Sequence, residues 1–190
     1  MQYLTRDQLD AGLAHIQASP SDGGRLEMLV RRPRTDEREV LEVGTLDLEA
    51  GLVGDKWRNG ARGKDSAEHL DMQLTLMNAR VAALVAGIRD RWPLAGDQLY
   101  VDLDLSDANL PPGTHLSIGE TVIEVTAVPH TGCRKFSARF GPDAIRFVNS
   151  KQGRRLNLRG VNAKVVEPGT IRVGDIAGKV SPKSLAIGSR

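Results

Sequence analysis

The chain has 190 residues, of which 26 are Lys or Arg and 24 are Asp or Glu, so its net charge at pH 7 is +2. This length fits one domain, and the near-neutral balance excludes a protein that coats a polyanion. An aromatic content of 4% argues against a stacking platform for single-stranded nucleic acid. The sequence lacks both a run of about 20 apolar residues and the apolar segment of a signal peptide. We therefore expect a soluble, cytoplasmic protein without a nucleic-acid or membrane partner.

The N-terminal segment is predicted to be helical. Thr5 and Gln8 have the spacing of a capping box, and apolar residues recur on one helical face from Leu9 to Ile16. A Ser-Pro-Ser-Asp-Gly-Gly stretch with strong turn chemistry follows. We therefore treat residues 1–24 as a helical extension of the main domain.

Three strands, two loops and a helix are expected next. Residues 26–30 and 40–48 have the length and apolar content of a hairpin, and the charged segment 31–39 between them is interpreted as a solvated loop. Residues 51–65 combine many glycines with many cations, so they predict a loop whose backbone amides can approach an anion. After the following strand, Asn78 is expected to cap a helix.

The second half of the chain consists of short apolar runs that are separated by glycine- and proline-containing turns. This spacing predicts a mainly β, barrel-like fold with a few peripheral α-helices. It lacks the strand–helix alternation of a doubly wound sheet. We assign residues 25–180 to this domain and residues 181–190 to a C-terminal tail.

Cys133 is the only cysteine, which excludes an internal disulfide. It follows a predicted strand, and its neighbours His130, Arg134 and Lys135 are expected to favour the thiolate through their positive charge. A thiolate is the form that attacks electrophiles, carries a persulfide or binds a soft metal. An inert, buried cysteine is the alternative interpretation.

Four stretches, in this order, resemble the MOSC family, the molybdenum-cofactor sulfurase C-terminal domains. They are Gly51–Lys56, Gly96–Leu99 with the turn that ends at Gly119, Pro129–Phe136, and Arg159–Asp175. The resemblance covers most of the chain, from about Leu26 to Val180. Two positions depart from the family pattern: Asp97-Gln98 replaces the usual Glu-Asn, and Asn162 stands where an aromatic residue is common.

The resemblance implies a site for the molybdenum cofactor, molybdopterin, or for sulfur destined for it, with pyridoxal phosphate binding as a further association of the family. It implies that Cys133 is a molybdenum ligand or a sulfur carrier, and His130 is the second catalytic candidate. The cofactor's phosphate needs cations and its pterin needs polar side chains. The residues that we assign to cofactor binding are Lys56, Arg58, Arg62, Lys64, Asn109, Arg134, Lys135, Arg159 and Asn162.

Three functions stay open. The protein reduces N-hydroxylated compounds with Cys133 as the metal ligand, or it is a non-catalytic carrier of the cofactor or of persulfide sulfur. The third alternative is a small β-barrel interaction domain whose cysteine is incidental. The sequence contains neither a desulfurase nor a ferredoxin domain, so we expect a separate protein as sulfur or electron donor, and a small molecule as substrate.

Overall fold

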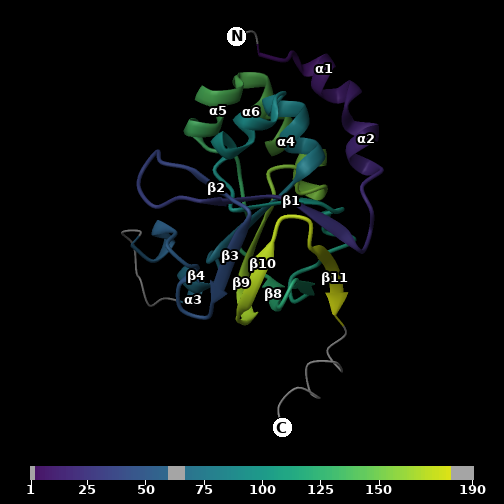
Figure 1. The fold of residues 1–190 in the computed structure, drawn as a ribbon. Helices are drawn as coiled ribbons and strands as arrows, with labels where there is room; N and C mark the ends of the chain where they lie inside the picture. The colour runs from purple at the N-terminus through teal and green to yellow at the C-terminus, as the bar shows by residue number, and fades with distance from the viewer. Residues whose placement is uncertain (1–2, 60–66, 181–190) are drawn as a thin grey trace.

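The centre of the protein is a closed barrel of seven strands (Figure 1). The structure is a computed structural model that describes residues 3–59 and 67–180. The strands follow one another around the barrel in the order β11-β7-β8-β9-β5-β6-β1, and β1 closes the barrel by pairing with β11. Their bounds are β1 Gly24–Arg31, β5 Leu74–Asn78, β6 Leu99–Asp102, β7 His115–Ile118, β8 Thr121–Val125, β9 Val161–Glu167 and β11 Ile176–Val180. The predicted barrel-like fold is thus confirmed.

The predicted hairpin is present, but its second strand is shorter than expected. β2 (Glu39–Leu41) pairs with β1, whereas β3 (Val43–Asp47) leaves the barrel and forms a second sheet with β4 (Gly51–Leu52) and β10 (Gly169–Arg172). The prediction of one strand over residues 40–48 is therefore wrong. The chain changes partner because β3 takes its hydrogen bonds from β4 and β10.

Most helices gather over one end of the barrel, at the top of Figure 1. They are α1 Arg6–Ala11, α2 Leu13–Gln17, α4 Ala79–Ala86, α5 Arg134–Phe140, α6 Pro142–Asn149 and α7 Lys151–Arg155, and the 3-10 helix η2 spans Arg89–Ala95. The short α3 (Ala67–Leu70) and the 3-10 helix η1 (Lys56–Asn59) belong to the segment around β4. The two predicted caps are confirmed: Thr5 forms a capping box on α1, and the side chain of Asn78 accepts from the first amides of α4.

Strand alternation divides the apolar residues between two cores. Leu76 and Leu99 point into the barrel, while Met77 and Tyr100, one position later, face the helices. Leu9 of α1 is fully buried in this second core, so the N-terminal helices pack against the domain. Within the part of the chain that the structure describes, no helix is both long and apolar enough to cross a membrane.

Candidate functional site

Cys133 is exposed at the start of α5, in a turn that is fixed from one side. The backbone amide of Gly132 donates to Asn149 Oδ1 (2.9 Å), and Asn149 Nδ2 donates back to the carbonyl of Gly132 (3.2 Å). Asn149 is the last residue of α6, so this helix anchors the turn. The thiol is therefore accessible, and the interpretation of Cys133 as a buried core cysteine is wrong.

The charged segment between β1 and β2 connects this turn with η1. The carboxylate of Asp36 accepts from Lys135 Nζ (3.0 Å) and from Arg139 Nη2 (3.0 Å), both on α5. One residue earlier, the hydroxyl of Thr35 accepts from Lys56 Nζ (3.2 Å). The segment that we interpreted as a solvated loop thus joins Lys56 to Lys135, which come from two different predicted site motifs.

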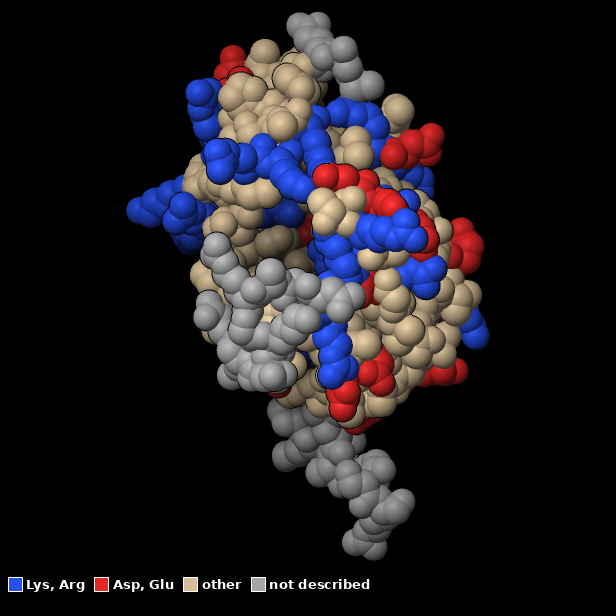
Figure 2. Space-filling view, turned by 90° about the vertical axis from the view of Figure 1, so that its left-hand side faces the viewer, with Lys and Arg blue, Asp and Glu red and all other residues tan. Residues whose placement is uncertain are grey.

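Four cations gather here, and we call Arg38, Lys56, Lys135 and Arg139 the basic cluster. Partial burial lowers the pKa of Lys56, and the charges of Arg38, Arg32 and Lys135 lower it further. The pKa of Arg38 is lowered mainly by burial and then by Arg139. Because these charges affect one another's pKa, the four cations lie close together. Figure 2 shows Lys and Arg side chains gathered around a hollow on this face.

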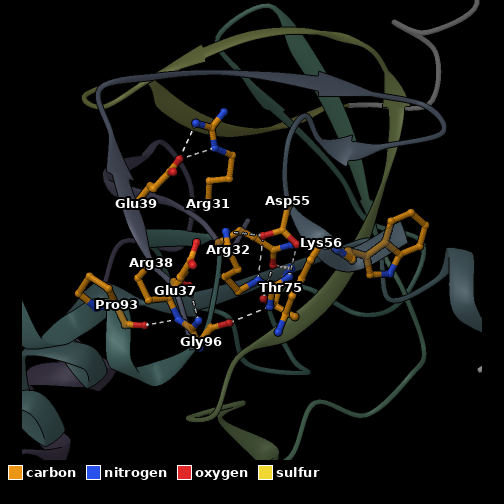
Figure 3. Close-up of polar contacts among 12 residues, drawn as sticks. Arg31, Arg32, Glu37, Arg38, Glu39, Asp55, Lys56, Thr75, Pro93 and Gly96 are labelled. Atoms are coloured by element: carbon orange, nitrogen blue, oxygen red, sulfur yellow. Dashed lines mark hydrogen bonds and ion pairs between the residues drawn. The ribbon is translucent and has the colours of Figure 1, made fainter. Parts of the chain in front are cut away.

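The basic cluster carries more positive charge than its carboxylate balances. Within the described residues, Arg38 and Lys56 form no ion pair, and Arg38 donates to the carbonyls of Pro93 (3.2 Å) and Glu37 (Figure 3). Asp36 is the carboxylate that Lys135 and Arg139 share, and the hydrogen bond from Lys135 lowers its pKa. One carboxylate therefore faces four cations, and the surplus charge attracts an anion.

Arg32 lies beside the cluster, but its charge is balanced by an ion pair with Asp55. Its Nε and Nη2 bind the two oxygens of the buried Asp55 at 2.9 and 3.0 Å, and its Nη1 donates to the carbonyl of Gly96 (2.8 Å), as Figure 3 shows. The backbone amide of Trp57 donates to the same carboxylate (2.9 Å). Arg32 and Asp55 therefore fix the base of the loop and the start of η1.

A buried ion pair lies beneath this surface. Arg159, only 6% exposed, binds both carboxylate oxygens of Asp97 through Nη1 (2.9 and 2.7 Å), and its Nη2 donates to the carbonyl of Ala95 (2.9 Å). The guanidinium also lies over the ring of Phe136, 5.1 Å from its centroid. Arg159 is thus committed to Asp97 and holds the loop before β6 against β9.

His130 lies beside this ion pair in its neutral form. Its Nδ1 is 3.5 Å from Asp97 Oδ1, but burial and the charge of Arg159 lower its pKa to about 3. His130 therefore adds no positive charge near Cys133 at pH 7, contrary to our expectation. Gly160 makes this packing feasible, because a Cβ at that position would lie 2.1 Å from the carbonyl oxygen of Leu76. Its φ of +110° also favours glycine.

A cavity of about 290 Å³ lies next to the segment that leads to Cys133. Its wall includes Val128, His130, Thr131, Val148 and Arg159. Within the described residues, His130 Nδ1 and Arg159 Nε are buried and have no hydrogen-bond partner. The cavity therefore joins apolar walls to a small number of buried polar atoms, as ligand pockets usually do.

The remaining predicted site residues lie in other surroundings. Arg58 is exposed and pairs with Glu49 (2.8 Å), and Asn162 is buried with its Nδ2 on the carbonyl of Val128 (2.9 Å). Asn109 donates to the carbonyls of Ser21 and Asp104 and accepts a hydrogen bond from Lys179. Arg134 is exposed next to Cys133 in the chain. Arg62 and Lys64 lie outside the described residues.

The structure therefore brings Lys56 and Lys135 together and places the exposed Cys133 at the N-terminus of the helix that carries Lys135, while Arg159 is buried and His130 is half-buried. Sequence reasoning missed Asp36, Arg38, Asp97 and Arg139. A signal was present for Arg139, which is four residues after Lys135 and hence on the same helical face. Within residues 3–59 and 67–180, no group of three or more His, Cys, Asp or Glu side chains is placed to hold a metal ion.

The protein is thus a small closed barrel in which one helix, α5, links the exposed thiol of Cys133 to the basic cluster. The sequence pattern of the MOSC domain matches residues 66–177, so the chain belongs to the MOSC family, which is linked to molybdenum cofactor binding. A search of curated proteins finds no match.

Solved structures show the same fold at low sequence identity. A crystal structure of a hypothetical protein superposes with a TM-score of 0.58 at 18% identity, covering 84% of this chain and 69% of the other. The YuaD protein from Bacillus subtilis gives 0.57 at 16% identity, covering 81% and 93%. YiiM from Escherichia coli gives 0.54 at 19% identity, covering 83% and 70%. These likenesses establish the fold alone.

Proposed function

We propose that the protein binds the molybdenum cofactor at the face that carries Cys133 and the basic cluster. The observation that carries this proposal is the accessible thiol of Cys133 at the N-terminus of α5, the helix whose Lys135 and Arg139 lie in the basic cluster with Lys56. Each part suits one chemical group of the cofactor. A thiolate is a soft ligand for the metal, and the surplus cations suit the phosphate.

In this proposal the protein's own residues bind and orient the group. Lys56 and Arg38 face the phosphate without a carboxylate partner of their own, and Asn149 fixes the turn that presents the Cys133 thiol. His130 is neutral at pH 7 and so does not act as an imidazolium proton donor there. The bound molybdenum supplies two-electron redox chemistry.

We further propose that the reaction is the reduction of N-hydroxylated compounds. An N-hydroxyl group takes up two electrons and two protons, its N–O bond breaks, and an amine and water leave. The electrons come from a separate electron-transfer protein. This finer assignment rests on the family resemblance, and the exposed position of Cys133 supports it because a small substrate can reach the thiol face.

The second candidate is a carrier of sulfur or of cofactor. The exposure of Cys133 at a helix start also favours this function, because a donor protein can reach the sulfur. In that reaction the thiolate attacks the outer sulfur of a donor persulfide, a new S–S bond forms on Cys133, and the donor leaves as a thiolate.

Turnover separates the two candidates. The protein is purified from a host that makes the cofactor and is assayed with reduced methyl viologen and an N-hydroxylated amidine. Oxidation of the dye together with amidine formation supports the enzymatic function. Lys135→Ala is expected to lower the turnover rate per chain because the variant loses cofactor. Lys151→Ala removes an exposed lysine on α7 and is the control. Protein that holds molybdenum but shows no turnover favours the carrier, and protein without molybdenum contradicts the proposal.

A further inference from the structure

We propose that Asp36 determines which anions the basic cluster accepts, because its carboxylate occupies the position of a ligand's anionic group between Lys135 and Arg139. Both cations bind the same oxygen, Oδ1, at 3.0 Å. Asp36 also interacts with the charges of Arg38 and Lys56, so it faces all four cations in the cluster. The inference concerns the same face as the proposed function and rests on that function for its biological ligand.

The loop can release this carboxylate without unfolding, because its two ends are held independently. Arg32 binds Asp55 at one end, and Arg31 donates to Glu39 across the hairpin (2.7 Å). Asp36 itself is 60% exposed and has a φ of +63°, a conformation that aspartate tolerates in turns. Among the described residues, its hydrogen bonds and ion pairs to α5 are the two with Lys135 and Arg139, so moving it breaks surface interactions.

Charge determines which ligands can displace Asp36. A monovalent anion brings no more charge than the carboxylate that it must replace, and that carboxylate is tethered at a high effective concentration. A phosphate group carries nearly two charges at pH 7 and brings three acceptor oxygens. The cluster has four cations, so its positive charge exceeds that of one carboxylate and suits a group with two negative charges. Asp36 therefore selects against monovalent anions.

The test compares Asp36→Asn with Glu37→Gln. Glu37 pairs with Arg34 (3.3 Å) at the same loop tip, so its substitution changes the net charge equally without touching α5. Binding of inorganic phosphate and of nitrate is measured by isothermal titration at pH 7.5 and constant ionic strength. We expect Asp36→Asn to bind phosphate about threefold to tenfold more tightly, as the loss of two competing surface ion pairs implies. Nitrate affinity should rise by a larger factor, and Glu37→Gln should change either affinity less than twofold.

Three results would overturn the inference: equal effects of the two substitutions, unchanged phosphate affinity in Asp36→Asn, or no phosphate binding by either the unaltered protein or the variant. The test separates this inference from the proposed function, because the titrations need no cofactor. A protein without molybdenum whose anion selectivity still depends on Asp36 would contradict the proposed function and support this inference. A protein with bound molybdenum and no role for Asp36 would do the reverse.

Discussion

Removing the charge of Asp97 should destabilise the protein strongly. In Asp97→Asn the guanidinium of Arg159 stays buried but loses the negative charge and one of its two oxygen acceptors, and a buried charge without its partner costs about 3–5 kcal/mol. For a chain of this length each kcal/mol lowers the melting temperature by about 2–4 °C. The variant should therefore melt roughly 6–20 °C lower, and urea unfolding should show the same loss of free energy.

Two variants make this prediction specific. Glu49→Gln removes the partner of Arg58 at the exposed surface, where an ion pair contributes about 0–1 kcal/mol, so its melting temperature should barely change. The double variant Asp97→Leu/Arg159→Met removes both charges and should recover much of the loss. An Asp97→Asn protein that loses less than about 1 kcal/mol would refute the reasoning, since it would show that Arg159 finds other partners or water.

Three further predictions concern the surroundings of the thiol. The pKa of His130 is about 3 in the folded protein and about 6.5 in the unfolded chain, so the unfolded chain binds more protons and stability falls as the pH drops. Between pH 7.5 and 5 the free energy of unfolding in urea should therefore fall by about 2 kcal/mol more in the unaltered protein than in His130→Gln. Equal losses in the two proteins would contradict this prediction. Asn149→Ala removes two hydrogen bonds to the turn before Cys133 and should cost about 1–2 kcal/mol in the same assay; an unchanged midpoint would show that the turn does not need α6. Lys56→Ala should weaken phosphate binding by about tenfold in titration calorimetry, whereas Arg58→Ala should leave the affinity unchanged. A larger loss of affinity in Arg58→Ala than in Lys56→Ala would show that the anion binds near Arg58 instead.

The fold was largely predictable because its signals are local. Capping by Thr5 and Asn78 depends on residues within one helical turn. The short strands are predicted by the alternation of apolar and polar residues and by the turn residues between them. The change of sheet after β2 was not predictable. It depends on pairing between β3 and β10, which lie more than 120 residues apart in the sequence, and no local pattern encodes that contact.

The candidate site was only partly predictable, for the same reason. The sequence around Cys133 identified the thiol and Lys135, because these residues are neighbours in the chain. The contact of Lys135 with Asp36 spans 99 residues, and that of Arg159 with Asp97 spans 62. Sequence reasoning gave Arg159 to the cofactor as a free cation, whereas the fold supplies it with a buried carboxylate.

The central claim is that Cys133 binds molybdenum, and the metal content of Cys133→Ser tests it most directly. Serine keeps nearly the same volume but lacks the soft thiolate, and the exposed side chain makes few packing contacts, so the variant should fold with an unchanged melting temperature. Both proteins are purified from a cofactor-producing host, and molybdenum per chain is measured by mass spectrometry. The account predicts bound molybdenum in the unaltered protein and its loss in the variant, whereas equal molybdenum in both proteins would contradict ligation by Cys133.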